Sequence, residues 1–76
     1  MSKEDEIVKA IYRFEQNNIG SDIGMDTGDL MSVVGMSTKP KEFWQIVNSL
    51  KETQTIKIND HGQINLTDAG NMLGSG

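Results

Sequence analysis

Residues 19–29 combine three aspartates with four glycine or serine residues, a composition found in loops that bind calcium or phosphate. A calcium loop ends on a glutamate that binds the ion through both carboxylate oxygens, and no glutamate follows Asp22 at that position. A phosphate-binding loop needs Lys-Ser or Lys-Thr after its last glycine, and neither Gly24 nor Gly28 is followed by such a pair. The segment is therefore predicted to be a connecting loop.

The single histidine, His61, is the first candidate for acid–base chemistry. It falls in a predicted hairpin turn, and no carboxylate or nucleophile stands at a spacing that would form a catalytic pair with it. The chain contains no cysteine, which excludes disulfides and thiolate-bound zinc. We therefore expect no enzyme activity, no catalytic residue, no metal and no cofactor.

A strongly amphipathic helix is predicted from Lys41 to about Thr53, with Pro40 in its first turn and Ser37 or Thr38 as its N-cap. Its apolar face holds Phe43, Ile46, Val47 and Leu50. At about 100° per residue, the opposite face holds Lys41, Gln45, Asn48 and Glu52. This outward row is polar and accessible, as either a binding surface or an ordinary solvated helix face would be.

Helix-capping residues and the spacing of apolar residues predict the elements that precede this helix. A first helix is expected to begin at Ser2, whose hydroxyl can cap its first turn, where residues 4–6 are acidic. The helix is expected to end at the Asn-Asn-Ile-Gly of residues 17–20. Its apolar stripe consists of Ile7, Ala10, Ile11 and Phe14. A short extended piece around residues 23–25 precedes a second helix over 28–34, which Asp26 or Thr27 caps and Gly35 ends.

The elements after it change to a period of two. Residues 55–58 and 63–66 alternate apolar and polar side chains, and Asn-Asp-His-Gly at 59–62 favours a hairpin turn between them. Thr67 is expected to cap a terminal turn of helix, and residues 74–76 to form a flexible tail. The sequence thus predicts an α+β fold.

This order of elements, together with the residues themselves, resembles the winged helix-turn-helix superfamily. The resemblance covers nearly the whole chain and rests on Asp29-Leu30, on Gly35-Met36-Ser37, on the ladder of Phe43, Val47 and Leu50, and on Ile64-Asn65-Leu66-Thr67-Asp68-Ala69-Gly70. The last segment is similar to the wing ending of small bacterial and archaeal repressors, including the multiple-antibiotic-resistance and phenolic-acid types. The resemblance as a whole implies a single winged-helix domain over residues 1–73, with three helices and a C-terminal two-stranded hairpin wing.

The resemblance implies a sequence-specific DNA-binding transcriptional regulator, such as those of bacteria, archaea and phages. In that family the third helix enters the major groove, where Lys41 would contact guanine and Gln45 adenine, with Asn48 one turn further on. The wing and the turn would bind the DNA backbone. The expected DNA-binding residues are Ser37, Thr38, Lys39, Lys41, Gln45, Asn48, Lys51, Lys57 and His61.

The net charge of −4 argues against nucleic acid until the charges are located along the chain. Residues 1–38 hold three basic and seven acidic side chains, whereas residues 39–57 hold four lysines against Glu42 and Glu52. The net negative charge therefore lies outside the predicted reading helix and first wing strand, which together carry a net charge of +2.

The alternative function is a winged-helix protein–protein interaction module that does not bind DNA. Double-stranded DNA, a second copy in a homodimer, or another protein is the expected partner. The interface candidates are Val8, Tyr12, Trp44, Met72 and Leu73. The acidic N-terminal residues and the lack of an apolar run of about 18 residues predict a cytoplasmic protein without membrane contact.

Overall fold

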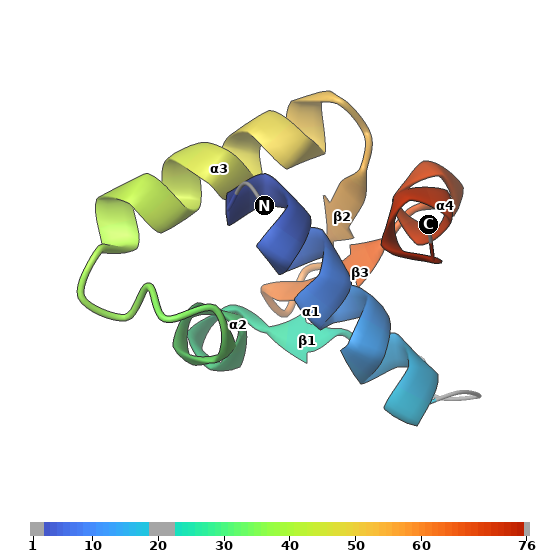
Figure 1. Ribbon diagram of the computed structural model, residues 1–76, viewed down its shortest axis with the longest axis horizontal. Helices are drawn as coiled ribbons and strands as arrows, with labels where there is room; N and C mark the ends of the chain where they lie inside the picture. Colours follow the sequence, from blue (N-terminus) through green and yellow to red (C-terminus); the bar gives the residue numbers. More distant parts are fainter. Residues whose placement is uncertain (1–2, 19–22, 76) are drawn as a thin grey trace.

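The structure, a computed structural model, describes residues 3–18 and 23–75 of the 76-residue chain as an α+β fold (Figure 1). In chain order the elements are α1 (Lys3–Asn17), β1 (Met25–Asp26), α2 (Thr27–Val33), α3 (Pro40–Glu52), β2 (Ile56–Ile58), β3 (Gln63–Leu66) and α4 (Asp68–Ser75). The α+β class is confirmed. The predicted number of elements is wrong, because the described residues form four helices and three strands, although the predicted hairpin is present as two strands of that sheet.

The sheet is antiparallel, with the strand order β1-β3-β2. The predicted hairpin pairs Ile56 with Leu66 and Ile58 with Ile64. The extended piece expected near residue 25 becomes a third strand, because Met25 and Asp26 pair with Ile64 and Gln63 at the free edge of β3. Alternation of side chains along each strand then gives the sheet one apolar face and one polar face.

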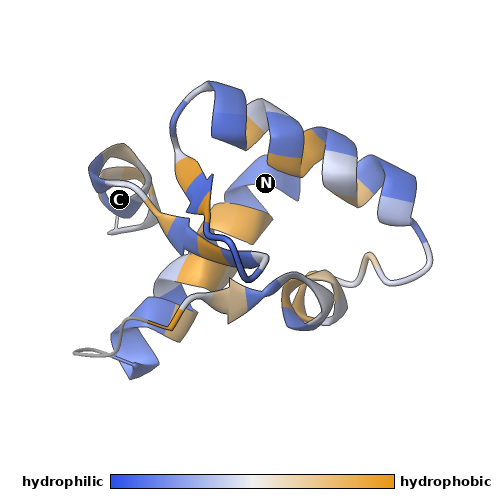
Figure 2. Ribbon diagram, turned by 180° about the vertical axis from the view of Figure 1, so that it is seen from behind, coloured by the Kyte–Doolittle hydropathy of each residue, from blue (hydrophilic) through white to orange (hydrophobic). Residues whose placement is uncertain are grey.

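Helix α1 runs through the middle of the molecule and contacts α2, α3, α4 and the sheet (Figure 1). Its predicted stripe is buried except for Phe14, which is partly buried, and Ile7 and Ile11 are fully inaccessible in one core with Leu30, Phe43 and Ile64. Figure 2 shows hydrophobic stretches of α1 and of the strands facing the interior, while α3 alternates between hydrophobic and hydrophilic stretches. These apolar faces hold the fold together, since the chain has no cysteine.

Local signals set several of the boundaries. The Asp26 carboxylate accepts a hydrogen bond from the Gly28 amide, which confirms it as the cap of α2. Gly35 has a φ of 71° and ends α2, with the amides of Gly35 and Met36 bonded back to Ser32 and Met31. The Thr67 hydroxyl accepts from the Gly70 amide at the start of α4, as expected. The predicted cap of the first helix, Ser2, lies outside the described residues.

Two predictions at chain segments are corrected. The N-cap of α3 is Lys39, which makes no side-chain capping bond, so neither Ser37 nor Thr38 caps it. The expected tail is helical at Gly74 and Ser75, because α4 continues through them and packs along α1. Residue 76 lies outside the described part of the chain.

Candidate nucleic-acid interface

Helix α3 presents a wide polar surface because only one side of it enters the core. Phe43, Val47 and Leu50 are buried, and Ile46 is partly buried. The predicted outward row of Lys41, Gln45, Asn48 and Glu52 is exposed. Pro40 occupies the first turn, where its missing amide proton costs no helical hydrogen bond. The predicted division of the helix into an apolar and a polar face is confirmed.

Four lysines lie on or next to α3 and the hairpin: Lys39, Lys41, Lys51 and Lys57. All four are exposed, and none forms an ion pair with any of the described residues. An ion pair on α1 joins Lys3 to Glu6, with a distance of 3.0 Å between Nζ and Oε2. The charges of these four lysines are therefore not neutralised by ion pairs within the described structure.

The predicted backbone-binding residues of the turn lie in the loop between α2 and α3. Ser37 and Thr38 are both exposed. The Ser37 and Ser32 hydroxyls lie 3.4 Å apart, so Ser37 contacts α2 rather than the first turn of α3. The loop spans residues 34–39, and the Lys39 amide bonds back to the carbonyl of Met36. Both hydroxyls remain accessible at the end of α3 where Lys39 and Lys41 lie.

The hairpin tip is closed by backbone hydrogen bonds between Asn59 and Gln63 and between Gly62 and Asn59, and by the Asn59 side chain. The Asn59 carboxamide oxygen accepts from the amides of His61 and Gln63, each at 2.9 Å, and its nitrogen donates to the Gln63 side chain. Gly62 adopts a φ of 75°, as the predicted turn requires. His61 is exposed at the tip, and Lys57 lies on the polar face of the sheet, paired across the hairpin with Asn65. The tip is thus a hydrogen-bonded, accessible turn.

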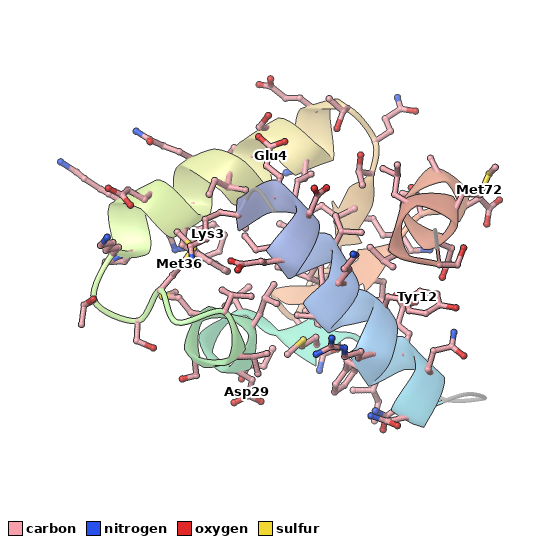
Figure 3. All side chains as sticks on the ribbon, viewed as in Figure 1. Lys3, Glu4, Tyr12, Asp29, Met36 and Met72 are labelled. Carbon is pink, nitrogen blue, oxygen red and sulfur yellow. The ribbon has the colours of Figure 1, made fainter. Side chains whose placement is uncertain are left out.

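The interface candidates fall into different environments. Val8 is only 4% exposed and belongs to the core, so its assignment to an interface is wrong: the apolar stripe of α1 is wider than its spacing indicated. Tyr12 is half-buried and contacts Gly74, because α4 packs against α1 at this point. Met72 and Leu73 are 76% and 61% exposed. Figure 3 shows Tyr12 beside α4 and Met72 pointing away from the molecule.

Trp44 is 39% exposed, and its ring meets that of Phe43 edge to face at 5.6 Å. One side of the indole therefore closes the edge of the core, as a tryptophan beside an apolar stripe commonly does. The remainder lies on the surface of α3. The ring therefore covers Phe43 and still presents accessible area.

A groove of about 250 Å³ opens elsewhere, between α1 and α2. Its lining residues are Glu6, Lys9, Ala10, Arg13, Val33 and Val34. It contains none of the predicted site residues, and it mixes charges of both signs. Within residues 3–18 and 23–75, no three histidine, aspartate or glutamate side chains gather as a metal site would require.

Comparison of the chain with protein-family models, with curated proteins and with solved structures found no match. None of the helices in the described residues is long and apolar enough to cross a membrane. The geometry and charge of α3 and the hairpin are therefore the features of the molecule that bear on its function.

Proposed function

We propose that this protein is a sequence-specific DNA-binding regulator of the winged helix-turn-helix type. The observation that carries the proposal is the group of four exposed lysines without ion-pair partners in the described structure, all on α3, its N-cap and β2. Lysines in such a group can bind the phosphates of a nucleic-acid backbone and release its counterions, which favours association. The order α1-β1-α2-α3-β2-β3 and the sheet order β1-β3-β2 support the winged-helix assignment.

In this proposal α3 enters the major groove and the hairpin lies along the backbone. Lys41 and Asn48 contact base edges, with Gln45 beside them. Lys39, Lys51 and Lys57 bind phosphates together with Ser37, Thr38 and His61, which fixes the position of the protein without reading sequence. Because one α3 of 13 residues reads few base pairs, two copies bound as a homodimer would double the site.

Selection from a random pool of duplexes, followed by titration at several salt concentrations, tests this function. We expect one enriched sequence, and a plot of log affinity against log salt with a slope of about −3 or steeper for several phosphate contacts. The variant Lys41→Ala should weaken binding to the enriched site. Absence of binding at low salt, or binding that does not depend on salt, would contradict the proposal.

A protein partner is the second candidate, and the exposed pair Met72 and Leu73 on α4 favours it. Neighbouring apolar side chains of this size on a small helix mark a surface suited to a protein contact. Light scattering after size exclusion tests the simplest case, a second copy. We expect a dimer that Leu73→Glu dissociates and that Ser75→Glu, which adds the same charge to another side of α4, leaves intact. A monomeric wild-type protein at high concentration would remove the homodimer from the proposal.

A further inference from the structure

The exposed surface of α3 divides into two parallel stripes that differ in charge. The first, called here the tryptophan stripe, consists of Lys41, Trp44, Asn48 and Lys51. The second, called the acidic stripe, consists of Glu42, Gln45, Ser49 and Glu52. All eight side chains are exposed. Both stripes repeat at i, i+3, i+7 and i+10, the spacing of neighbours along one side of a helix.

The two stripes point in directions about 100° apart, because each residue of the second follows a residue of the first. The tryptophan stripe carries two positive charges and no negative charge, whereas the acidic stripe carries two negative charges and no positive charge. None of these four charged side chains forms an ion pair within the described structure. The charge of α3 therefore cancels in total while remaining separated across its surface.

This separation changes which side of α3 suits a polyanion. The row opposite Phe43, taken alone, contains Lys41 and Gln45 but ends on Glu52, and a duplex centred on it would meet a carboxylate. A duplex centred on the tryptophan stripe meets Lys41 and Lys51 at its two ends. The side of α3 that best suits a duplex is thus rotated from the row opposite Phe43 toward Trp44.

Trp44 supplies a hydrogen-bond donor at the centre of that stripe. Its exposed fraction is 39%, and its indole nitrogen has no hydrogen-bond partner among the described residues. An indole N–H can only donate, and a phosphate oxygen is one acceptor that it can bind. The edge contact with Phe43, at a ring-centroid distance of 5.6 Å, holds the ring in place on the helix.

We propose that the tryptophan stripe of α3 is the surface that contacts duplex DNA, with the Trp44 N–H donating to a backbone phosphate between Lys41 and Lys51 and with the acidic stripe turned away from the DNA. This inference rests on the proposed DNA-binding function and specifies its orientation. It also places Gln45 at the edge of the DNA contact, since that residue belongs to the acidic stripe.

The matched variants Lys51→Gln and Glu52→Gln test the orientation, because they remove opposite charges from adjacent exposed residues in the last turn of α3. Binding of a labelled duplex is followed by fluorescence anisotropy across a salt series. We expect Lys51→Gln to weaken binding and to make the salt slope shallower by about 1. Glu52→Gln should change the affinity less than twofold, because Glu52 faces away from the phosphates.

The variant Trp44→Phe tests the donor while keeping an aromatic ring against Phe43. We expect binding to weaken about tenfold or more, as loss of a hydrogen bond to a charged group does. Circular dichroism checks that the variant keeps its fold. In the wild-type protein the emission of Trp44, the single tryptophan of the chain, should change when the duplex is added.

The outcomes separate this inference from the proposed function. If the wild-type protein binds duplex DNA but Glu52→Gln tightens binding severalfold while Lys51→Gln and Trp44→Phe leave it unchanged, DNA binding stands and the orientation is overturned. Tighter binding to a single strand than to the duplex also overturns the orientation, because the stripe would then act by stacking on bases. If the wild-type protein binds no duplex even at low salt, the function and the inference both fail.

Discussion

The carboxylate of Glu15 on α1 accepts a 3.0 Å hydrogen bond from the backbone amide of Leu66 on β3, which joins residues 51 positions apart. Leu66 lies beyond Gln63 and Ile64, the two residues of β3 that pair with β1. Its amide therefore has no strand partner on that side, and a side chain from α1 takes the place of the missing strand.

Replacing Glu15 by alanine should lower the free energy of unfolding by about 1–2 kcal/mol, because it leaves the amide of Leu66 without an acceptor. Glu15→Gln is the control, since its carboxamide oxygen can still accept the bond. Urea denaturation followed by circular dichroism measures both. Equal stability of the alanine variant and the wild-type protein would show that water satisfies this amide as well as Glu15 does.

Substitution of Gly70 by alanine should be strongly destabilising. A Cβ atom at this position would overlap the carbonyl oxygen of Thr55 and press against Leu66, where α4 meets the sheet. We expect a loss of about 1–3 kcal/mol or detachment of α4.

Gly28→Ala is the matched control for Gly70→Ala, because Gly28 is also helical and nothing lies within 4 Å of its added Cβ. It should leave stability unchanged or raise it by up to about 1 kcal/mol through helix propensity. Thermal unfolding of the two variants compares them. A Gly70→Ala protein as stable as Gly28→Ala would contradict the close packing of α4.

The hairpin tip should loosen when Asn59 is replaced by alanine, since two amides lose their acceptor. We expect hydrogen exchange of the His61 and Gln63 amides to accelerate by about tenfold, which corresponds to roughly 1.4 kcal/mol of local stability. Asn59→Asp keeps an accepting oxygen and should retain protection. Unchanged exchange in the alanine variant would mean that Gly62 and the strands alone hold the turn.

Removal of Lys39 or Lys57 should weaken DNA binding uniformly across sequences, because the proposal places both on phosphates. Each alanine variant is expected to make the log–log salt slope shallower by about 1. Arg13→Ala removes the same charge from α1, outside the proposed interface, and should leave the slope unchanged. A slope that responds equally to all three variants would indicate non-specific attraction to overall charge instead of a defined surface.

Local interactions explain why much of the fold was predictable. The cap at Asp26, the turn at Asn59 and the break at Gly35 depend on residues close together in the chain. The separation of α3 into two charged stripes could also have been read from its spacing. The predicted row instead took every polar residue opposite Phe43 together, and so combined members of both stripes.

Contacts between distant segments explain the errors. The sequence did not indicate that β1 would reach the free edge of β3, so the sheet was expected to have two strands. Val8 was predicted to belong to an interface, but the elements that pack against α1 bury it. The glycines at the C-terminus predicted a flexible tail. The structure instead has a helix there, because α4 packs against α1, a contact between distant segments that no local pattern indicates.

The sequence by itself determined the element types, the apolar faces and the concentration of lysines after residue 38, because these follow from periodicity, capping and composition. Tertiary structure decided which surfaces remain available. It buried Val8, placed Tyr12 against α4, exposed Met72 and left part of Trp44 accessible between two lysines of α3. The physical reason is that burial depends on what a side chain meets across the core, and its neighbours in the chain do not specify that.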